Sequence, residues 1–239
     1  MKTVYHPANK RGGSHHGWLK SKHSFSFADY YSPDRVGFGA LKVINDDYIE
    51  GGHGVGAHSH RNMEIITIPL AGALIHEDDI GNKSTIHAGD IQVMSAGTGV
   101  VHSEINASQD IPVKLLQIWL ESNQRDVTPR YQQVSLVELL KPNRFNQVLS
   151  PNTHDAGVWV HQNAWFSVGE FDKGVTQNYL LNHPDNGVYV FVIFGSVVIE
   201  GKVLQPRDGL GITGIADTET VRIEVIDQAQ LLLMEIPIS

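Results

Sequence analysis

The sequence predicts an all-β protein made of two antiparallel barrels. Short apolar stretches recur along most of the chain, and turns rich in Gly, Asn and Asp separate them at spacings of about 8–12 residues. A segment of the first half also has a counterpart in the second half. The length of 239 residues fits one large domain or two domains of about 100–150 residues each.

The first group of strands is expected after residue 40. Turn signals end these strands, for example at Asp46-Asp47, at Ala71-Gly72 and at Ala88-Gly89-Asp90. Before them, Ser24–Phe27 alternates in polarity as a short strand does. The expected strands are Leu41–Asn45, Glu64–Leu70, Ala73–His76, Ile91–Met94 and Val113–Leu120.

A different stretch follows and divides the chain into three parts. Val134–Leu140 could form one or two helical turns that Lys141-Pro142-Asn143 would stop. We therefore expect an N-terminal barrel with an N-terminal arm over 1–130, a linker with a short helical turn over 131–156, and a C-terminal barrel over 157–239. The strands expected in the last part are Val158–Val160, Ala164–Val168, Thr176–Leu181, Gly187–Phe194, Val197–Ile199, Val221–Ile226 and Leu231–Ile238.

The two halves share a short pattern. Leu70–Ile75 parallels Ile193–Val198, each with a central glycine, and each is followed by a strand and then by a turn that contains Asp90 or Asp208. The glycine-to-aspartate gap is 18 residues in the first half and 13 in the second. Short β segments also resemble one another by chance, but the pattern favours two barrels from a duplicated unit.

Composition excludes several classes of protein. Hydrophobic residues at 41% and charged residues at 18% indicate a packed core. The absence of cysteine excludes disulfides and thiolate ligands, so a metal site must use His and carboxylates. A formal charge of −8 argues against broad binding to nucleic acid. No signal peptide is visible at the N-terminus. The longest apolar run, Val188–Phe194, is too short to span a bilayer, so a cytoplasmic location is expected.

Charge is unevenly distributed along the chain. Residues 1–42 carry seven Lys/Arg and two Asp/Glu, a net charge of +5, which leaves about −13 on the remainder. A basic arm that lies over an acidic body is the simpler interpretation. The alternative is an arm that binds a protein partner.

Two pairs of metal-ligand residues are the strongest functional signal. They are His58-Ser59-His60 and His102-Ser103-Glu104. In a strand, side chains at i and i+2 point to the same face, so each pair projects together. If the two strands lie side by side, three imidazoles and one carboxylate converge, which suits a divalent transition metal. The second half has no such pairs, so one site per chain is expected.

The setting of these pairs separates them from the other histidines. Gly51–Gly56 precedes the first pair and Ser95–Gly99 precedes the second, and both stretches allow tight turns. A histidine without such a setting is usually exposed or hydrogen-bonded. We expect that ordinary role for His6, His15, His16, His76, His87, His154, His161 and His183.

Longer motifs around the pairs resemble a known family. The spacing Gly52-x5-His58-x-His60-x3-Glu64 resembles the first cupin motif, and Gly89-x5-Ser95-x-Gly97 followed by Gly99-x2-His102-x3-Asn106 resembles the second, with two extra residues and Ser95 in place of proline. Further phrases narrow the resemblance to pirins, closest to bacterial pirins with quercetin 2,3-dioxygenase activity. They are His16–Leu19, His23–Ala28, Val43–Asp47, His58–Glu64 and Ser95–Glu104. The resemblance is dense over about 10–130 and implies a bicupin of the jelly-roll type.

The resemblance leaves two candidates for the carboxylate ligand. General cupins take it from the first motif, here Glu64, and pirins take it from the second, here Glu104. Both residues have the right parity for the metal face, but Glu104 lies nearer in sequence to a ligand histidine. We expect the ligand set His58, His60, His102 and Glu104. Glu64 is expected either to accept a hydrogen bond from an imidazole N–H and so orient a ligand ring, or to be a structural residue at the edge of the core.

The resemblance implies an enzyme that holds one divalent metal ion, most often iron(II), with Mn, Co, Ni, Cu or Zn as alternatives. Its substrates would be O2 and a flavonol such as quercetin, whose ring opens with release of carbon monoxide, and Glu104 would be both ligand and base. Phe25, Phe27 and Trp119 are candidates for an aromatic pocket wall. A non-enzymatic metal-binding regulator that acts through a protein partner is the alternative, and a metabolite-binding cupin such as an isomerase is a third. No contact with nucleic acid or membrane is expected.

Overall fold

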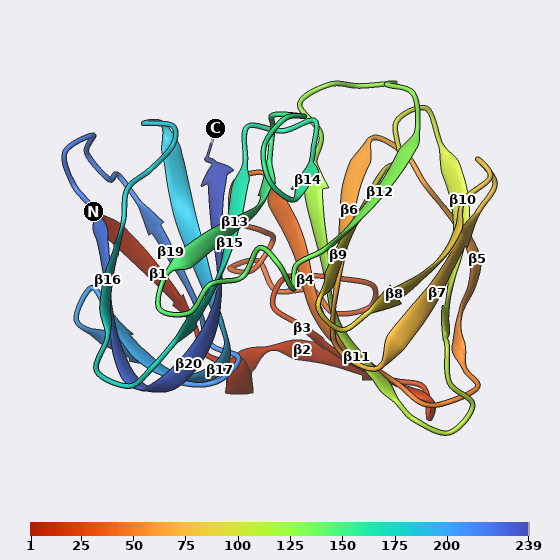
Figure 1. Ribbon diagram of the computed structural model, residues 1–239, viewed down its shortest axis with the longest axis horizontal. Coiled ribbons are helices and arrows are strands. Elements are labelled where there is room, and N and C mark those ends of the chain that lie inside the picture. Colours follow the sequence, from red (N-terminus) through yellow and green to blue (C-terminus); the bar gives the residue numbers. More distant parts are fainter. Residues whose placement is uncertain (239) are drawn as a thin grey trace.

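The structure, a computed structural model that describes residues 1–238, consists of two β lobes side by side (Figure 1). Twenty strands and one short 3-10 helix, Ala8–Lys10, make up its regular structure within the described residues. No helix among residues 1–238 has the length and apolar character needed to cross a membrane. The prediction of an all-β chain with two jelly-roll lobes is confirmed.

The N-terminal lobe packs a seven-stranded sheet against a four-stranded sheet. The larger sheet has the order β12-β9-β6-β11-β4-β3-β2, and the smaller has the order β5-β10-β7-β8. The larger sheet contains β2 (Gly12–His15), β3 (Leu19–His23), β4 (Leu41–Ile49), β6 (Met63–Ala71), β9 (Asp90–Ser95), β11 (Val113–Glu121) and β12 (Arg130–Ser135). The smaller contains β5 (Gly54–His60), β7 (Ala73–Asp78), β8 (Lys83–His87) and β10 (Val100–Asn106).

The C-terminal lobe is one nine-stranded sheet folded around its own core. Its main order is β1-β19-β17-β20-β15-β13-β14, with β16 beside β20 and β18 beside β17. The strands are β1 (Lys2–His6), β13 (Phe145–Ser150), β14 (Val158–Trp159), β15 (Trp165–Phe171), β16 (Thr176–Tyr179), β17 (Asn186–Ile199), β18 (Lys202–Leu204), β19 (Gly209–Thr213) and β20 (Val221–Pro237).

The largest apolar core lies between the lobes. One face of the seven-stranded sheet contributes Ile44, Ile66 and Leu116, and the facing sheet contributes Phe191 and Leu232. Burial on both faces explains the continuous apolar runs Val188–Ile193 of β17 and Leu231–Met234 of β20, whose alternate residues belong to this core and to the core of the C-terminal lobe. Since the lobes share this core, they form one packed unit.

Two glycines repeat the same backbone feature in the two lobes. Gly72 and Gly195 have φ of 76° and 78°, a left-handed conformation that disfavours other residues. A Cβ at Gly72 would lie 2.9 Å from the Pro112 carbonyl oxygen, and one at Gly195 would lie 2.0 Å from that of Gln228. The shared pattern seen in the sequence thus corresponds to a shared turn.

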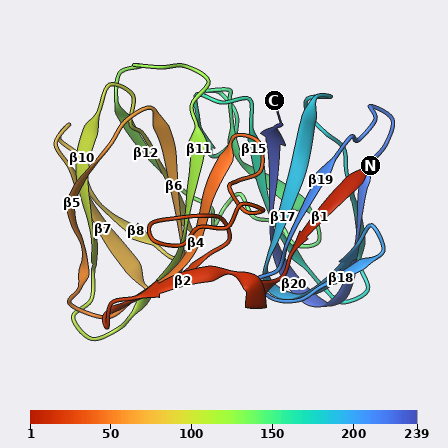
Figure 2. The same cartoon turned by 180° about the vertical axis from the view of Figure 1, so that it is seen from behind.

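The N-terminal segment belongs to both lobes. β1 pairs with β19 of the C-terminal lobe, and the chain then passes beneath the lobes to β2 and β3 (Figure 2). Asp208 fixes the segment between β1 and β2 to the C-terminal lobe, because its carboxylate accepts hydrogen bonds from the Tyr5 hydroxyl and the Ala8 amide. Arg11 of the segment forms an ion pair with Asp46. These contacts agree with the simpler interpretation of a basic arm that lies on the body.

Residues 131–156, expected from the sequence to be a linker, contribute strands to both lobes. β12 pairs with β9 in the first lobe and β13 pairs with β15 in the second. Between them, hydrogen bonds from the Leu139 and Leu140 amides to the Leu136 carbonyl form a single turn. Ser24–Phe27 forms no strand, and only Phe27 makes an isolated bridge, with Tyr30.

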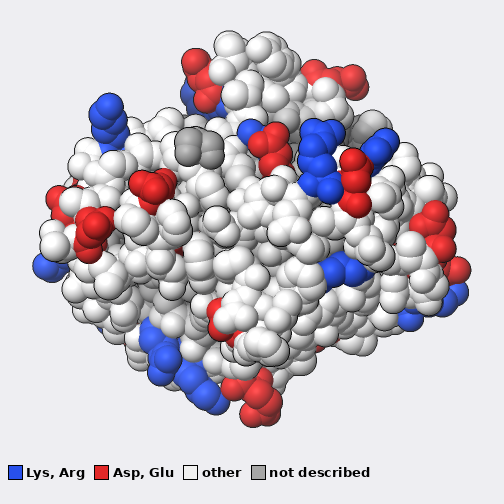
Figure 3. Space-filling model, turned by 90° about the horizontal axis from the view of Figure 1, so that it is seen from above, with Lys and Arg blue, Asp and Glu red and all other residues white. Residues whose placement is uncertain are grey.

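Charged side chains are scattered over the face shown in Figure 3. Lys and Arg alternate there with Asp and Glu and with broad uncharged areas. The described part of this face has no continuous basic region.

Candidate metal centre

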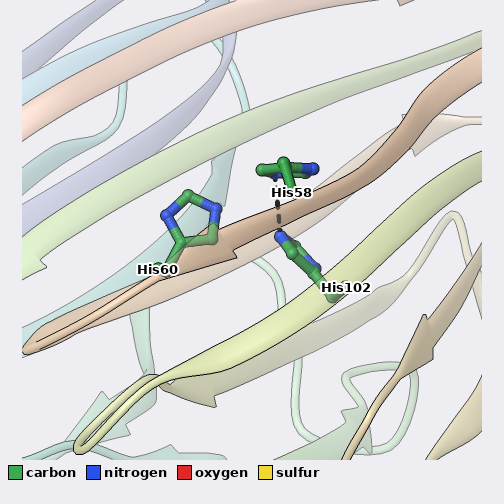
Figure 4. Close-up of side chains that lie close together, drawn as sticks. All are labelled: His58, His60 and His102. Carbon is green, nitrogen blue, oxygen red and sulfur yellow. Dashed lines mark hydrogen bonds between the residues drawn. The ribbon is translucent and has the colours of Figure 1, made fainter.

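Two neighbouring strands bring the predicted histidines together. β5 carries His58 and His60, β10 carries His102, and the register of the two strands pairs His102 with His58. One nitrogen of each ring lies within 4.8 Å of one nitrogen of both others. Figure 4 shows the three rings gathered between the two strands. The structure therefore brings together three of the four predicted ligands.

The orientation of His58 is fixed by its own backbone. Its Nδ1 lies 2.9 Å from the carbonyl oxygen of Gly56. A carbonyl only accepts, so Nδ1 carries the proton and Nε2 has a free lone pair. That Nε2 lies 3.0 Å from Nε2 of His102, along the dashed line in Figure 4.

His60 presents a buried nitrogen without a partner. Among the described residues, nothing forms a hydrogen bond with its Nε2. Its ring packs edge to face on Trp119, with ring centroids 4.8 Å apart. Burial, with a smaller contribution from the neighbouring His58, lowers the pKa of His60 to about 4. Burial and then the adjacent imidazoles lower the pKa of His102 to about 3.

These features fit a divalent metal ion. Imidazoles bind metals in the neutral form, which the lowered pKa values of His60 and His102 favour at neutral pH. Two nitrogens each about 2.1 Å from one ion, at a right angle, lie about 3 Å apart. The observed separation of the His58 and His102 Nε2 atoms is 3.0 Å. The unpartnered Nε2 of His60 supplies a third donor.

Glu104 is buried on β10 but is not a member of the three-histidine cluster. A β-bulge separates it from His102. Gln117 Nε2 donates to its Oε2 over 2.6 Å, and the Thr67 hydroxyl donates to Oε1 over 3.3 Å. The side chain thus meets two hydrogen-bond donors, one at each carboxylate oxygen.

Glu64 lies on the opposite side of β6 from the metal site. It shares a face with Ile66, which belongs to the core between the lobes, whereas Ile65 packs near Trp119. Its Oε2 accepts a hydrogen bond of 2.7 Å from Ser95. The prediction that Glu64 shares the metal face was wrong, because the chain turns between β5 and β6 at Asn62, whose φ is 52°.

His76, for which the sequence predicts an ordinary role, contacts the cluster. Its Nδ1 lies 3.4 Å from Nδ1 of His102, and its Nε2 lies 2.9 Å from Oδ2 of Asp78. Burial would raise the pKa of Asp78, but hydrogen bonds from His76 and Asn82 outweigh it and lower that pKa. The sequence offered one signal: His76 and Asp78 are an i, i+2 pair, although the predicted strand Ala73–His76 stopped short of Asp78.

The three candidate pocket aromatics separate into two groups. Phe25 is 1% exposed in the core between the lobes, where it packs on Tyr189, so it does not line the site. Trp119 contacts His60, and Phe27 packs edge to face on Trp119 at 5.4 Å. Trp119 therefore lies beside the cluster, and Phe27 reaches it only through Trp119.

Comparisons with known proteins agree with the geometry. Residues 5–120 match the family model Pirin, and residues 147–236 match the model described as Quercetinase C-terminal cupin domain. The chain is 40% identical to Quercetin 2,3-dioxygenase of Escherichia coli K12 over 236 residues, which is 96% of each chain.

Solved structures give the same result. The crystal structure of YhhW from Escherichia coli matches with a TM-score of 0.93 and 38% identity, covering 100% of this chain and 99% of YhhW. The bacterial pirin YhhW in complex with nickel(II) matches with a TM-score of 0.91 and 38% identity over 100% of both chains. On this sequence identity over nearly the whole length, and on its two cupin lobes, the chain belongs to the pirin family.

Proposed function

We propose that this pirin is a metal-dependent dioxygenase that cleaves a flavonol such as quercetin with O2. One observation carries the proposal. Three buried or half-buried imidazoles converge in a chain that is 40% identical, over 96% of its length, to an Escherichia coli protein named Quercetin 2,3-dioxygenase.

We propose His58, His60 and His102 as metal ligands, with Glu104 as the fourth. The mixed nitrogen and oxygen donor set accepts several divalent metals, so availability decides more than affinity does. We propose iron(II) as the metal in the active enzyme, and the nickel(II) complex of the related YhhW supports a site that takes other divalent ions too. A bound ion would act as a Lewis acid on a substrate hydroxyl and lower its pKa.

Glu104 is the proposed base. Its Oε2 is held by the short bond from Gln117, whereas Oε1 receives only the longer bond from Thr67. Oε1 therefore keeps more capacity to accept the proton of a substrate hydroxyl. Removal of that proton raises the electron density of the flavonol for reaction with O2.

Trp119 and Phe27 are proposed to position the substrate. A flat aromatic molecule gains from offset or edge-to-face contacts with such rings. Trp119 already makes such a contact with His60, which places an apolar surface directly beside the ligands. The same surface would limit access of water to the reacting atoms.

The test is to add quercetin in air to protein loaded with iron(II), and separately with Ni, Mn, Co, Cu and Zn, and to measure flavonol absorbance and O2 uptake. The proposal predicts that the absorbance falls while O2 is consumed. Glu104→Gln should abolish turnover while the folded state survives. Glu77→Gln is the matched control, since Glu77 is exposed and pairs with Lys83. Full turnover by Glu104→Gln would remove the proposed base. Bound metal without turnover by any loaded form would reject the dioxygenase and leave a binding function.

A further inference from the structure

A buried chain of three side chains leads from the metal site into the four-stranded sheet. It runs from His102 to His76 and then to Asp78, across the paired strands β10 and β7. The side chains of His76 and Asp78 are 0% exposed. The Tyr131 ring packs on His76 with ring centroids 4.7 Å apart and covers it.

Asp78 has a defined role at the inner end of this chain. Asn82 donates its backbone amide to Oδ1 over 2.8 Å and its side-chain amide to Oδ2 over 2.9 Å. An ionised carboxylate only accepts, so the 2.9 Å contact of Oδ2 with His76 requires a proton on His76 Nε2. Asp78 thus determines which nitrogen of His76 carries its proton.

The consequence passes through His76 to the ligand. A neutral His76 with its proton on Nε2 has a lone pair on Nδ1. His102 Nδ1, at 3.4 Å, must then be the donor of that contact. With its proton on Nδ1, His102 keeps the lone pair of Nε2, which lies 3.0 Å from Nε2 of His58. In these tautomers neither Nε2 is a donor, so the two nitrogens are arranged to share a cation rather than a proton.

We propose that Asp78 and His76 are positioning residues that hold His102 in the tautomer able to bind metal through Nε2. The inference rests on the metal site of the proposed function and is independent of the oxygenase reaction. For His58 a backbone carbonyl performs the same task. Outer hydrogen-bond partners of this kind fix the ring orientation of metal-binding histidines.

The most informative variant is Asp78→Asn, which keeps the shape of the side chain. Two Asn82 donors compete for its one oxygen, so its amide nitrogen is left to face His76 Nε2. That donor would move the His76 proton to Nδ1 and the His102 proton to Nε2, where it blocks the metal. We expect affinity for Zn(II) or Ni(II), measured at fixed pH against a chromophoric chelator, to fall roughly 10–100-fold.

A second pair of variants keeps the test valid if Asp78→Asn folds poorly. His76→Asn offers an amide oxygen near the position of Nδ1 and should retain affinity within a few-fold. His76→Leu offers no acceptor and should lose affinity as Asp78→Asn does. Glu77→Gln, on the same strand but exposed, should leave affinity unchanged.

The tautomer itself gives a readout that does not depend on activity. Two-bond proton–nitrogen correlation spectra of the metal-free protein, with nitrogen-labelled histidine, report which nitrogen of His102 is protonated. We expect Nδ1 in the wild type and in His76→Asn, and Nε2 in Asp78→Asn. An Nε2 proton in the wild type, or unchanged affinity in both Asp78→Asn and His76→Leu, would overturn the proposal even if quercetin is turned over.

Discussion

The indole N–H of Trp119 donates a hydrogen bond of 3.3 Å to Oε1 of Gln117. Because an indole can only donate, this bond fixes which end of the Gln117 amide is oxygen. The amide nitrogen must then face Glu104, where it donates over 2.6 Å. One aromatic side chain thus contacts His60, a proposed ligand, and also determines how the proposed base is held.

Gln117→Glu tests this arrangement. The substitution would set a second carboxylate about as close to Glu104 as the present hydrogen bond, and two carboxylates at that distance share one proton. We expect quercetin turnover to fall at least about tenfold at neutral pH and to recover in part as pH rises. Turnover is measured from flavonol absorbance between pH 6 and 9, with Gln117→Met as the uncharged control. Wild-type turnover across that range would contradict the role given to Gln117.

Removal of metal is expected to destabilise the protein. An ion that binds only the folded state adds about 2.7 kcal/mol when its free concentration is 100 times its Kd. The thermal unfolding temperature should therefore be higher with Ni(II) than with excess chelator. His60→Gln should unfold at nearly the same temperature in both conditions. His154→Gln, at an exposed loop position, should keep the wild-type difference in unfolding temperature between the two conditions. If this variant also loses that difference, the stabilising ion does not bind at the three-histidine cluster alone.

Glu64 gives stability a distinct pH dependence. Burial raises its pKa from 4.5 to about 7, against smaller opposing effects of Ser95 and Arg130. Between these pH values the folded chain holds a proton that the unfolded chain has lost, so its contribution to stability decreases as pH rises from about 4.5 to 7. The loss is at most about 3 kcal/mol.

The matching variant is Glu64→Gln. In metal-free protein its free energy of unfolding should depend less on pH than that of the wild type. The stability of the variant relative to the wild type should therefore increase as pH rises towards 8. Urea unfolding at pH 5, 6.5 and 8 measures both profiles. Parallel profiles for the two proteins would show that Glu64 titrates normally.

Asp46 joins the two lobes and the N-terminal segment. Its Oδ2 lies 3.0 Å from Arg11 and 2.9 Å from Arg207, and all three side chains are largely buried. Asp46→Asn leaves two guanidinium groups without their anion and should lower the free energy of unfolding by about 3 kcal/mol. The double variant Asp46→Asn/Arg207→Gln should recover part of that loss, because only one uncompensated cation remains. Urea unfolding checks both, and strictly additive losses would argue against a coupled triad.

The sequence alone determined the parts of this protein that depend on local geometry. Side chains at i and i+2 of a strand share a face, so the motif His58-Ser59-His60 by itself indicated the first half of the candidate site. Gly72 and Gly195, at matching places in the shared sequence pattern, likewise allow the left-handed turn found in both lobes. Both pairs of ligand-type residues lie in the first half of the chain, so the sequence predicted the site there.

The tertiary structure decided what depends on pairing between distant segments. Parity along the chain assigned Glu64 to the metal face, but one left-handed residue at Asn62 turned β6 over and placed Glu64 between the lobes. The pair His76 and Asp78 did not by itself indicate a contact with the metal site, and only the register of β7 with β10 set His76 against His102. Side-chain direction within a strand is fixed by the backbone of that strand, whereas the register between strands is fixed by the packing of the whole fold.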